Sequence, residues 1–213
     1  MSATLPDSSI GAQGIIMTSD IIFATVPLGL GIASSHRIGK SLGAGSASTA
    51  RFQSRIPYLV ALIVGAIECV ILLSARNVYG RIFTDDEDVV SVTAKVLPLL
   101  AVFQCLDISN GGAAGVLRGA GKTHLAGGSN IIGYYGVGLV LAWAFCFKAK
   151  LGLFGLWAGL ITGSGSLLLM QTGWVFTIKW DREAGRVLAE AAERAKLKGS
   201  DETAPLLQDR PAS

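Results

Sequence analysis

The sequence predicts an all-α, polytopic transmembrane helical bundle with about five spans. Of its 213 residues, 51% are hydrophobic, only 15% are charged and 27 are glycine, whereas soluble domains carry about 25% charged residues. Residues 125–147 and 151–178 contain no Asp, Glu, Lys or Arg. Each of these two segments can cross roughly 30 Å of hydrocarbon as a helix that rises about 1.5 Å per residue.

Three further apolar segments complete the predicted bundle, at residues 15–35, 56–75 and 96–117. Each is interrupted by one acidic residue, and in chain order these are Asp20, Glu68 and Asp107. A large soluble protein can also bury apolar helices, but this chain has too little polar sequence to cover five of them. We therefore interpret all five segments as membrane spans.

The charges in the loops predict which side of the membrane each loop faces, because positive residues in short loops tend to stay in the cytoplasm. The first and third connections and the segment after the fifth span carry Arg37, Lys40, Arg51, Arg55, Arg118, Lys122, Lys179, Arg182 and Arg186. Residues 1–36 contain neither Lys nor Arg, and the second connection sets four acids against two arginines. Only Lys148 and Lys150, in the fourth connection, run against the rule.

This alternation divides the chain into three parts. We expect residues 1–14 to be an extracellular or lumenal segment, residues 15–178 to form the transmembrane lobe, and residues 179–213 to be a cytoplasmic tail. An odd number of spans with an outward amino terminus and no basic signal region leads us to expect further sequence upstream.

The tail changes character along its length. Residues 181–198 alternate charges with Ala and Leu at helical spacing, which predicts an amphipathic helix at the membrane surface or a solvated one. Residues 199–213 are polar and contain proline, which is typical of disorder. Glu202 followed by Leu206 and Leu207 resembles an acidic dileucine sorting signal, although so short a pattern also arises by chance.

The stretch GVLRGAGKT, residues 115–123, resembles a phosphate-binding loop but does not fit its spacing. The pattern G-x-x-x-x-G-K-[ST] requires glycine at the position of Val116, and Gly115 is one residue out of register. We therefore interpret this stretch as the inner end of a membrane helix and not as a nucleotide site.

Other classes of site find little support. Cys69, Cys105 and Cys146 each lie inside an apolar span without C-x-x-C spacing, so we expect packing roles and neither disulfides nor a metal site. No basic cluster interleaved with aromatics points to nucleic acid, and no residue pattern indicates catalysis or a cofactor.

Acidic residues inside a membrane are costly and are retained where they face other helices or a water-filled cavity. Asp107 is the strongest candidate, because it heads a stripe of small residues four positions apart, at Gly111, Gly115 and Gly119. Such a stripe lets another helix approach closely, so Asp107 should point into the bundle. A buried carboxylate of this kind can hold either a proton or an organic cation, which is the minimal chemistry of an antiporter.

The two remaining intramembrane acids have two interpretations each. Asp20, near the outer end of the first span, is either an interfacial carboxylate or part of a pathway, and Glu68 is either functional or part of a structural pair. Pro27 should kink the first span. Gly155, Gly159 and Gly163 repeat the small-residue spacing in the fifth span and are interpreted as packing.

Five segments, in this order and spacing, carry a resemblance to a known family. They are IASSHRIGKSLGAG (32–45), YGRIFTDDEDV (79–89), LPLLAVFQCLDISNGGAAGVLRGAGK (97–122), NIIGYYGVGL (130–139) and GLFGLWAGL (152–160). Together they resemble the C-terminal half of a eukaryotic, fungal-like transporter of the multidrug and toxic compound extrusion (MATE) family. The five spans then look like helices eight to twelve of such a transporter.

The resemblance implies a fold of two six-helix bundles around a cavity that opens alternately to each side. It also implies export of organic cations or drugs in exchange for protons or sodium, in the vacuolar or plasma membrane. Asp107 falls where eukaryotic members carry an acidic residue implicated in cation and proton binding. Tyr134 and Tyr135 fall in helix eleven and are either substrate contacts or packing aromatics.

The chain also departs from the family pattern. The N-terminal bundle and helix seven have no counterpart here, and Thr18 stands where animal members show an acid, which leaves Asp20 as a possible substitute. We expect the partners to be the lipid bilayer, small organic cations and a missing N-terminal lobe, in the same protein or in another chain. The alternatives are a non-transporting membrane fragment that associates with a full-length transporter, and a lipid flippase.

Overall fold

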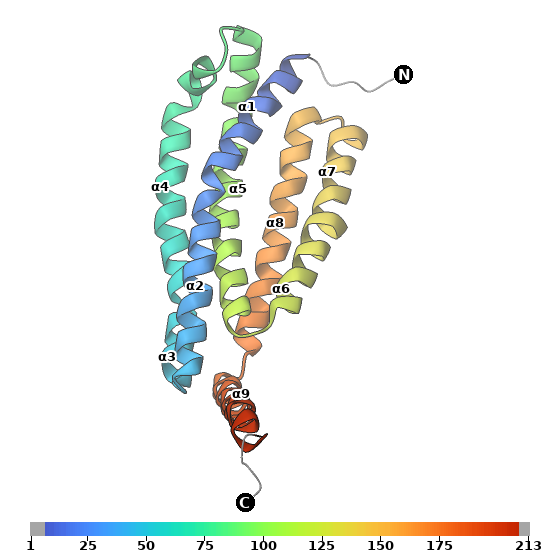
Figure 1. Ribbon diagram of the computed structural model, residues 1–213. Helices are drawn as coiled ribbons and strands as arrows, with labels where there is room; N and C mark the ends of the chain where they lie inside the picture. The colour runs from blue at the N-terminus through green and yellow to red at the C-terminus, as the bar shows by residue number, and fades with distance from the viewer. Residues whose placement is uncertain (1–6, 209–213) are drawn as a thin grey trace, which may run out of the picture.

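The structure is a computed structural model that describes residues 7–208, with side chains described for residues 7–197. The described residues form an all-helical bundle (Figure 1). Five helical segments are long and apolar enough to span a membrane, at Asp7–Gly43, Ala47–Ile82, Glu87–Gly119, Thr123–Lys148 and Gly152–Thr177. The predicted number of spans is therefore confirmed, although the first three are longer than expected.

The helices that build these spans follow each other with short connections. In chain order they are α1 (Asp7–Phe23), α2 (Thr25–Gly43), α3 (Ala47–Gln53), α4 (Ile56–Tyr79), η1 (Gly80–Ile82), α5 (Glu87–Gly119), α6 (Thr123–Asn130), η2 (Ile131–Leu139), α7 (Val140–Trp143), η3 (Ala144–Lys148), α8 (Gly152–Thr177) and α9 (Trp180–Gln208). The segments η2 and η3 are π-helical turns within the fourth span, and η1 is a short 3₁₀ turn.

The central helix of the bundle is α5, which packs against α1, α2, α4 and α8. Its first turn is capped by Asp86, whose carboxylate accepts hydrogen bonds from the backbone N–H groups of Asp88 and Val89. Such a cap satisfies donors that an α-helix leaves free at its start. Apolar side chains of α5 contribute to both hydrophobic clusters of the bundle.

The glycine stripe of α5 lies directly against α2. A Cβ atom added at Gly111 would collide with the carbonyl oxygen of Pro27, and one added at Gly115 would collide with that of Gly31. At Gly119 the added atom would lie 2.6 Å from the carbonyl oxygen of Ser35. The two backbones therefore touch along three turns, as the small-residue spacing predicted.

The stripe in the fifth span is confirmed as a packing surface. A Cβ atom at Gly155 would lie 2.5 Å from the backbone of Phe145, and one at Gly163 would lie 2.5 Å from the Cα atom of Gly138. Helix α8 is thereby held close to the fourth span, to which α6, η2, α7 and η3 belong. Large apolar side chains such as Leu62 and Leu169 face outward and are exposed, which suits a lipid-facing surface.

The helix of the first span begins earlier than expected. Helix α1 starts at Asp7, before the expected residue 15, and residues 1–6 lie outside the described part of the chain. Asp20 lies in the last turn of α1, and its side chain is half-buried. The expected kink is present as a break at Ala24 between α1 and α2, because Pro27 has no N–H group to bond the carbonyl of Phe23.

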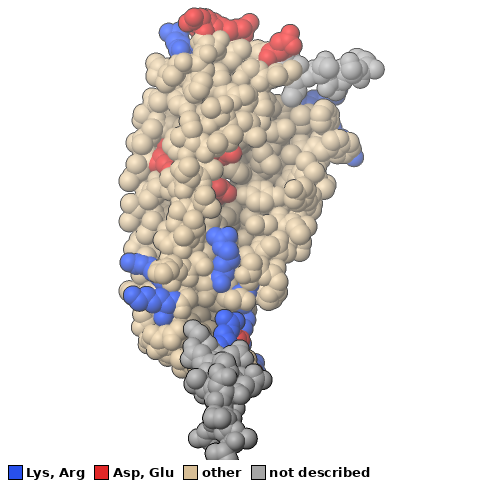
Figure 2. Space-filling view, in the orientation of Figure 1, with Lys and Arg blue, Asp and Glu red and all other residues tan. Residues whose placement is uncertain are grey.

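The two ends of the bundle carry opposite charge. Acidic side chains gather at the upper end, where α4 connects to α5, and Lys and Arg side chains gather toward the lower end (Figures 1 and 2). We call the lower end, formed by α3, the α5–α6 connection and the start of α9, the basic end. This separation agrees with the alternation of charge along the sequence.

Helix α9 is attached to the basic end by a buried carboxylate and by the buried side chains of Trp180 and Ala184. Glu183, which is 8% exposed, forms ion pairs with Lys122 Nζ at 2.8 Å and with Arg186 Nε at 3.0 Å. Lys122 therefore neutralises an acid of α9, and the Gly-Lys-Thr stretch forms a helix connection, as expected. The preceding Gly121 adopts a φ of +73° in this turn, which favours glycine.

The carboxyl-terminal tail differs in part from the expectation. Helix α9 continues to Gln208, so the segment 199–208, expected to be disordered, is helical, and residues 209–213 lie outside the described residues. The side chains of the dileucine-like pattern, at Glu202, Leu206 and Leu207, also lie outside the described part.

The contact between α2 and α5 predicts a large effect of a single methyl group. We expect Gly115→Ala to lower the free energy of unfolding by about 1–3 kcal/mol, because the added Cβ atom cannot be accommodated beside Gly31 without separating the helices. Thermal unfolding of the purified chain in detergent measures this change. The control is Gly29→Ala in α2, where an added Cβ atom meets nothing within 4 Å; equal unfolding midpoints for the two variants would contradict the prediction.

The attachment of α9 predicts a dependence on pH. Burial alone would raise the pKa of the Glu183 carboxyl, but the hydrogen bonds and charges of Lys122 and Arg186 outweigh burial and lower this pKa below its usual 4.5. Because the folded-state pKa is lowered, the stabilisation is present above pH 4.5 and is lost as the pH falls through the lower value.

We therefore expect Glu183→Gln to accelerate amide hydrogen exchange in the first turns of α9 by roughly tenfold or more at neutral pH, since a charged hydrogen bond contributes about 1.5–3 kcal/mol. The exchange rate of the wild type should approach that of the variant only at acidic pH, where Glu183 becomes protonated. Glu190→Gln is the matched control, because Glu190 is half-exposed and contacts Arg186 alone. Unchanged exchange in Glu183→Gln would show that α9 is held by other contacts.

Candidate functional site

The three acidic residues predicted from the spans come from three different helices, with Asp20 on α1, Glu68 on α4 and Asp107 on α5. Asp20 and Glu68 each lie near enough to Asp107 to interact with its charge. We call this group the carboxylate cluster. Its members are half-buried or buried inside the bundle, where unpaired charge is costly.

Asp107 is held by the fourth span. Its Oδ1 atom accepts a hydrogen bond of 3.0 Å from the phenolic O–H of Tyr134. Tyr134 lies in the π-helical segment η2, and π-helical turns frequently occur at functional sites. The side chain thus points toward the fourth span and away from lipid, as the sequence predicted.

The two tyrosines of the fourth span have different surroundings. Tyr134 is half-buried and contacts Asp107, whereas the neighbouring Tyr135 is 69% exposed on the outer surface. Tyr134 therefore lies at the carboxylate cluster, whereas Tyr135 faces outward.

Asp20 is held by a residue that the sequence analysis did not identify. Gln104 Nε2, on α5, donates a hydrogen bond of 3.1 Å to Asp20 Oδ1. Gln104 is fully buried, and its Oε1 atom has no hydrogen-bond partner among the described residues. The sequence did contain a sign of its role, because Gln104 precedes Asp107 by three residues, and residues at this spacing lie on the same face of a helix.

Glu68 is the most buried member of the carboxylate cluster, with 5% exposure. Its Oε2 atom has no hydrogen-bond partner among the described residues. A buried carboxyl oxygen needs a proton, a cation or water as its partner. The structural pair with another side chain that was one reading of Glu68 is not found in the described part of the chain.

Polar contacts continue from the carboxylate cluster toward the basic end. Asn110 Nδ2, on α5, donates to the backbone oxygen of Ser164 at 3.1 Å and to its Oγ atom at 2.8 Å. Farther along α8, Gln171 Nε2 donates to Asn130 Oδ1 at 3.1 Å. We call these pairs, together with the carboxylate cluster and Gln104, the polar seam; it runs from α1 and α4 across α5 to α8 and the fourth span.

The electrostatics of the carboxylate cluster favour a cation. Among the described residues, no ion pair includes Asp20, Glu68 or Asp107. Two or more carboxylates in an apolar bundle repel each other unless a proton or another cation neutralises them. Within the described part of the chain, no group of three or more His, Cys, Asp and Glu residues has the arrangement of a metal site.

Comparisons with known proteins connect this arrangement to one family. Residues 1–144 match the MatE family. The chain is 36% identical over 204 residues to multidrug and toxin extrusion protein 2 of Mus musculus, with 96% of this chain and 35% of that protein covered. It is 36% identical over 185 residues to multidrug and toxin extrusion protein 1 of Homo sapiens, covering 85% of this chain and 32% of that protein.

The fold is also found in solved structures. The eukaryotic MATE transporter AtDTX14 superposes with a TM-score of 0.78 and 27% identity over 87% of this chain and 41% of that chain. An inward-facing multidrug resistance MATE transporter of the MOP superfamily gives a TM-score of 0.76 at 20% identity, over 86% of this chain and 44% of that one, which supports the fold alone.

The chain spans about a third of the length of the curated relatives reported above. Its family match, its identity to animal members and its five membrane-spanning helical segments agree. This integral membrane protein therefore belongs to the MATE family of multidrug and toxin extrusion transporters.

Proposed function

We propose that the chain forms part of a membrane antiporter that exports organic cations or drugs in exchange for protons or sodium by alternating access. The observation that carries the proposal is the position of Asp107, an acid inside the bundle that accepts a hydrogen bond from Tyr134 and has no basic partner in the described ion pairs. The names of the animal relatives, multidrug and toxin extrusion proteins, support a cargo of drugs and toxins.

The coupling follows from competition at one carboxylate. An ionised Asp107 attracts an organic cation or a sodium ion, whereas a protonated Asp107 has no charge with which to hold either. A proton arriving from the acidic side therefore displaces the exported cation, and loss of that proton on the other side restores the site. Asp20 and Glu68, as neighbours, add negative potential to the same region.

We infer that the transport pathway needs a second helical bundle. The chain covers 41% of AtDTX14, and a pathway with alternating access requires walls on two sides that move against each other. The second bundle is either part of the same protein or supplied by another chain. The basic end is assigned to the cytoplasm by the positive-inside rule, in a plasma or vacuolar membrane.

The first transport prediction concerns the charge of Asp107. We expect Asp107→Asn to reduce proton-driven uptake of a fluorescent organic cation such as ethidium to background, because the amide can neither ionise nor bind a proton in this range of pH. Uptake is measured in inside-out vesicles from a transporter-deficient host that produces the chain together with a MATE amino-terminal lobe. The matched control is Asp85→Asn, which removes an exposed acid in the connection between α4 and α5, at the end of the bundle opposite the basic end.

Undiminished uptake by Asp107→Asn, with normal membrane insertion, would exclude Asp107 from the mechanism. Vesicles that contain the chain without the added lobe separate the two kinds of assembly. Uptake in these vesicles indicates that copies of the chain build the pathway together, whereas uptake only with the lobe indicates that the chain supplies one wall.

The second transport prediction concerns the hydrogen bond to Asp107. We expect Tyr134→Phe to weaken cation uptake by roughly tenfold while preserving coupling to protons, because a hydrogen bond to a charged group contributes about 1.5–3 kcal/mol and the carboxylate itself remains. Tyr135→Phe, one residue away on the exposed surface, should transport as the wild type does. Equal effects of the two variants in the same vesicle assay would contradict a positioning role for Tyr134.

A further inference from the structure

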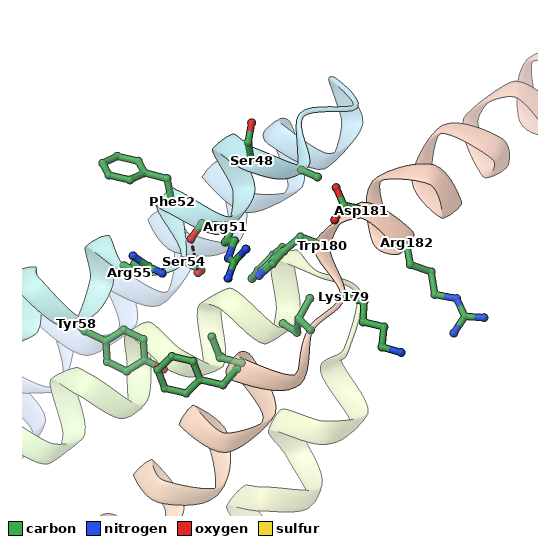
Figure 3. Close-up of a pocket in the computed structure, with 14 residues that line it drawn as sticks. Ser48, Arg51, Phe52, Ser54, Arg55, Tyr58, Lys179, Trp180, Asp181 and Arg182 are labelled. Carbon is green, nitrogen blue, oxygen red and sulfur yellow. Dashed lines mark hydrogen bonds between the residues drawn. The ribbon is translucent and has the colours of Figure 1, made fainter.

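A separate cavity of about 800 Å³ lies at the basic end, away from the carboxylate cluster. One wall comes from α3 and the start of α4, and the other comes from the end of α8 and the start of α9 (Figure 3). The cavity joins segments that are more than a hundred residues apart in sequence, and the proposed transport chemistry does not use it.

The lining of this cavity is strongly basic. It includes four cationic side chains, Arg51, Arg55, Lys179 and Arg182, against the single acid Asp181. None of the four takes part in an ion pair among the described residues. A cavity with this excess of positive charge attracts an anion.

The arginines are arranged on one side of an aromatic ring. In Figure 3, Arg51 lies beside Trp180, Arg55 lies farther along the same wall, and Lys179 and Arg182 extend outward from the other wall. Trp180 is 8% exposed and joins the hydrophobic cluster of the basic end. A guanidinium group can donate two parallel hydrogen bonds to a phosphate, which a lysine cannot do.

The cavity lies at the ends of two membrane-spanning segments, at the start of Ala47–Ile82 and the end of Gly152–Thr177. The helix of one wall, α4, begins at Ile56, and the helix of the other, α8, ends at Thr177, so the cavity lies where two membrane spans meet the aqueous phase. Phe176 lines the cavity and is 79% exposed toward the outer surface. Aromatic residues are enriched at this level of a membrane, where one end of the side chain is apolar and the other is wet.

We propose that this cavity binds the headgroup of an anionic phospholipid, with its phosphate at Arg51 and Arg55 and its acyl chains along the exposed surface beside Phe176. The combination of charge and exposed apolar lining favours a lipid over a free phosphate ion, since phosphate alone leaves the exposed rings of Phe52 and Phe176 without a partner. Basic pockets between spans on the cytoplasmic side are suited to such lipids.

Binding here would tie α3 to the junction of α8 and α9. That junction also carries the contact between Glu183 and Lys122, so a bound lipid would reinforce the attachment of α9. The inference does not depend on the transport proposal, because none of the lining residues belongs to the polar seam.

The test compares two lipids with matched acyl chains, phosphatidylserine and phosphatidylcholine, added to the full chain in nonionic detergent. Native mass spectrometry measures how much of each lipid stays bound. We expect the wild type to retain phosphatidylserine in preference to phosphatidylcholine. In Arg51→Gln/Arg55→Gln the ratio of bound phosphatidylserine to bound phosphatidylcholine should fall by roughly thirtyfold, because each basic residue near an anionic surface contributes on the order of a fivefold gain in binding.

Two further variants make the result specific. Lys148→Gln/Lys150→Gln removes the same charge from two exposed residues in the connection between the fourth and fifth spans, outside this cavity, and should change the preference by less than about threefold, because electrostatic attraction falls off within a Debye length. Arg51→Lys/Arg55→Lys keeps the charge and should retain part of the preference. Circular dichroism and gel filtration verify that each variant is folded.

Equal loss in the two glutamine variants would overturn the proposal, since it would show a general effect of charge. So would displacement of phosphatidylserine by inorganic phosphate at millimolar concentration, which would identify the cavity as a phosphate site. An absence of preference in the wild type would also overturn it.

Discussion

The bundle depends on the direct contact between the backbones of α2 and α5. Three glycines of α5 leave no room for a side chain against α2, and in hydrocarbon such close packing replaces the hydrophobic effect as the force that joins helices. Because α5 also packs against α1, α4 and α8, its position determines theirs. The same helix carries Gln104, Asp107 and Asn110, so the contact that organises the bundle also directs its polar side chains inward.

The polar seam shows how these side chains are tolerated in an apolar medium. Amides and hydroxyls on facing helices bond to each other, as Asn110 does to Ser164 and Gln171 does to Asn130, so that much of their desolvation cost is offset. The carboxylate cluster is different, because it combines several acids with no described basic partner. An excess of negative charge at the centre of a membrane protein is a strained arrangement that a cation or a proton relieves.

The basic end has the opposite character. There, positive side chains meet the surface of the membrane, and Glu183 joins α9 to the connection after α5 through Lys122. The cavity between α3 and α9 adds a second basic surface at the same depth. The proposed binding of cations at the centre and of anions at one end thus follows from a single distribution of charge, from which we also infer the orientation of the chain in the bilayer.

The sequence by itself determined the spans, the two glycine stripes, the separation of charge and the candidate acids, because hydropathy, small-residue spacing and loop charge act locally along the chain. Only the tertiary structure decided that Tyr134 contacts Asp107 while Tyr135 faces outward, that Gln104 holds Asp20, and that α3 and α9 enclose a basic cavity. These contacts join residues on different helices, and their geometry depends on how the helices rotate and tilt against one another. The sequence of a single span does not encode that arrangement.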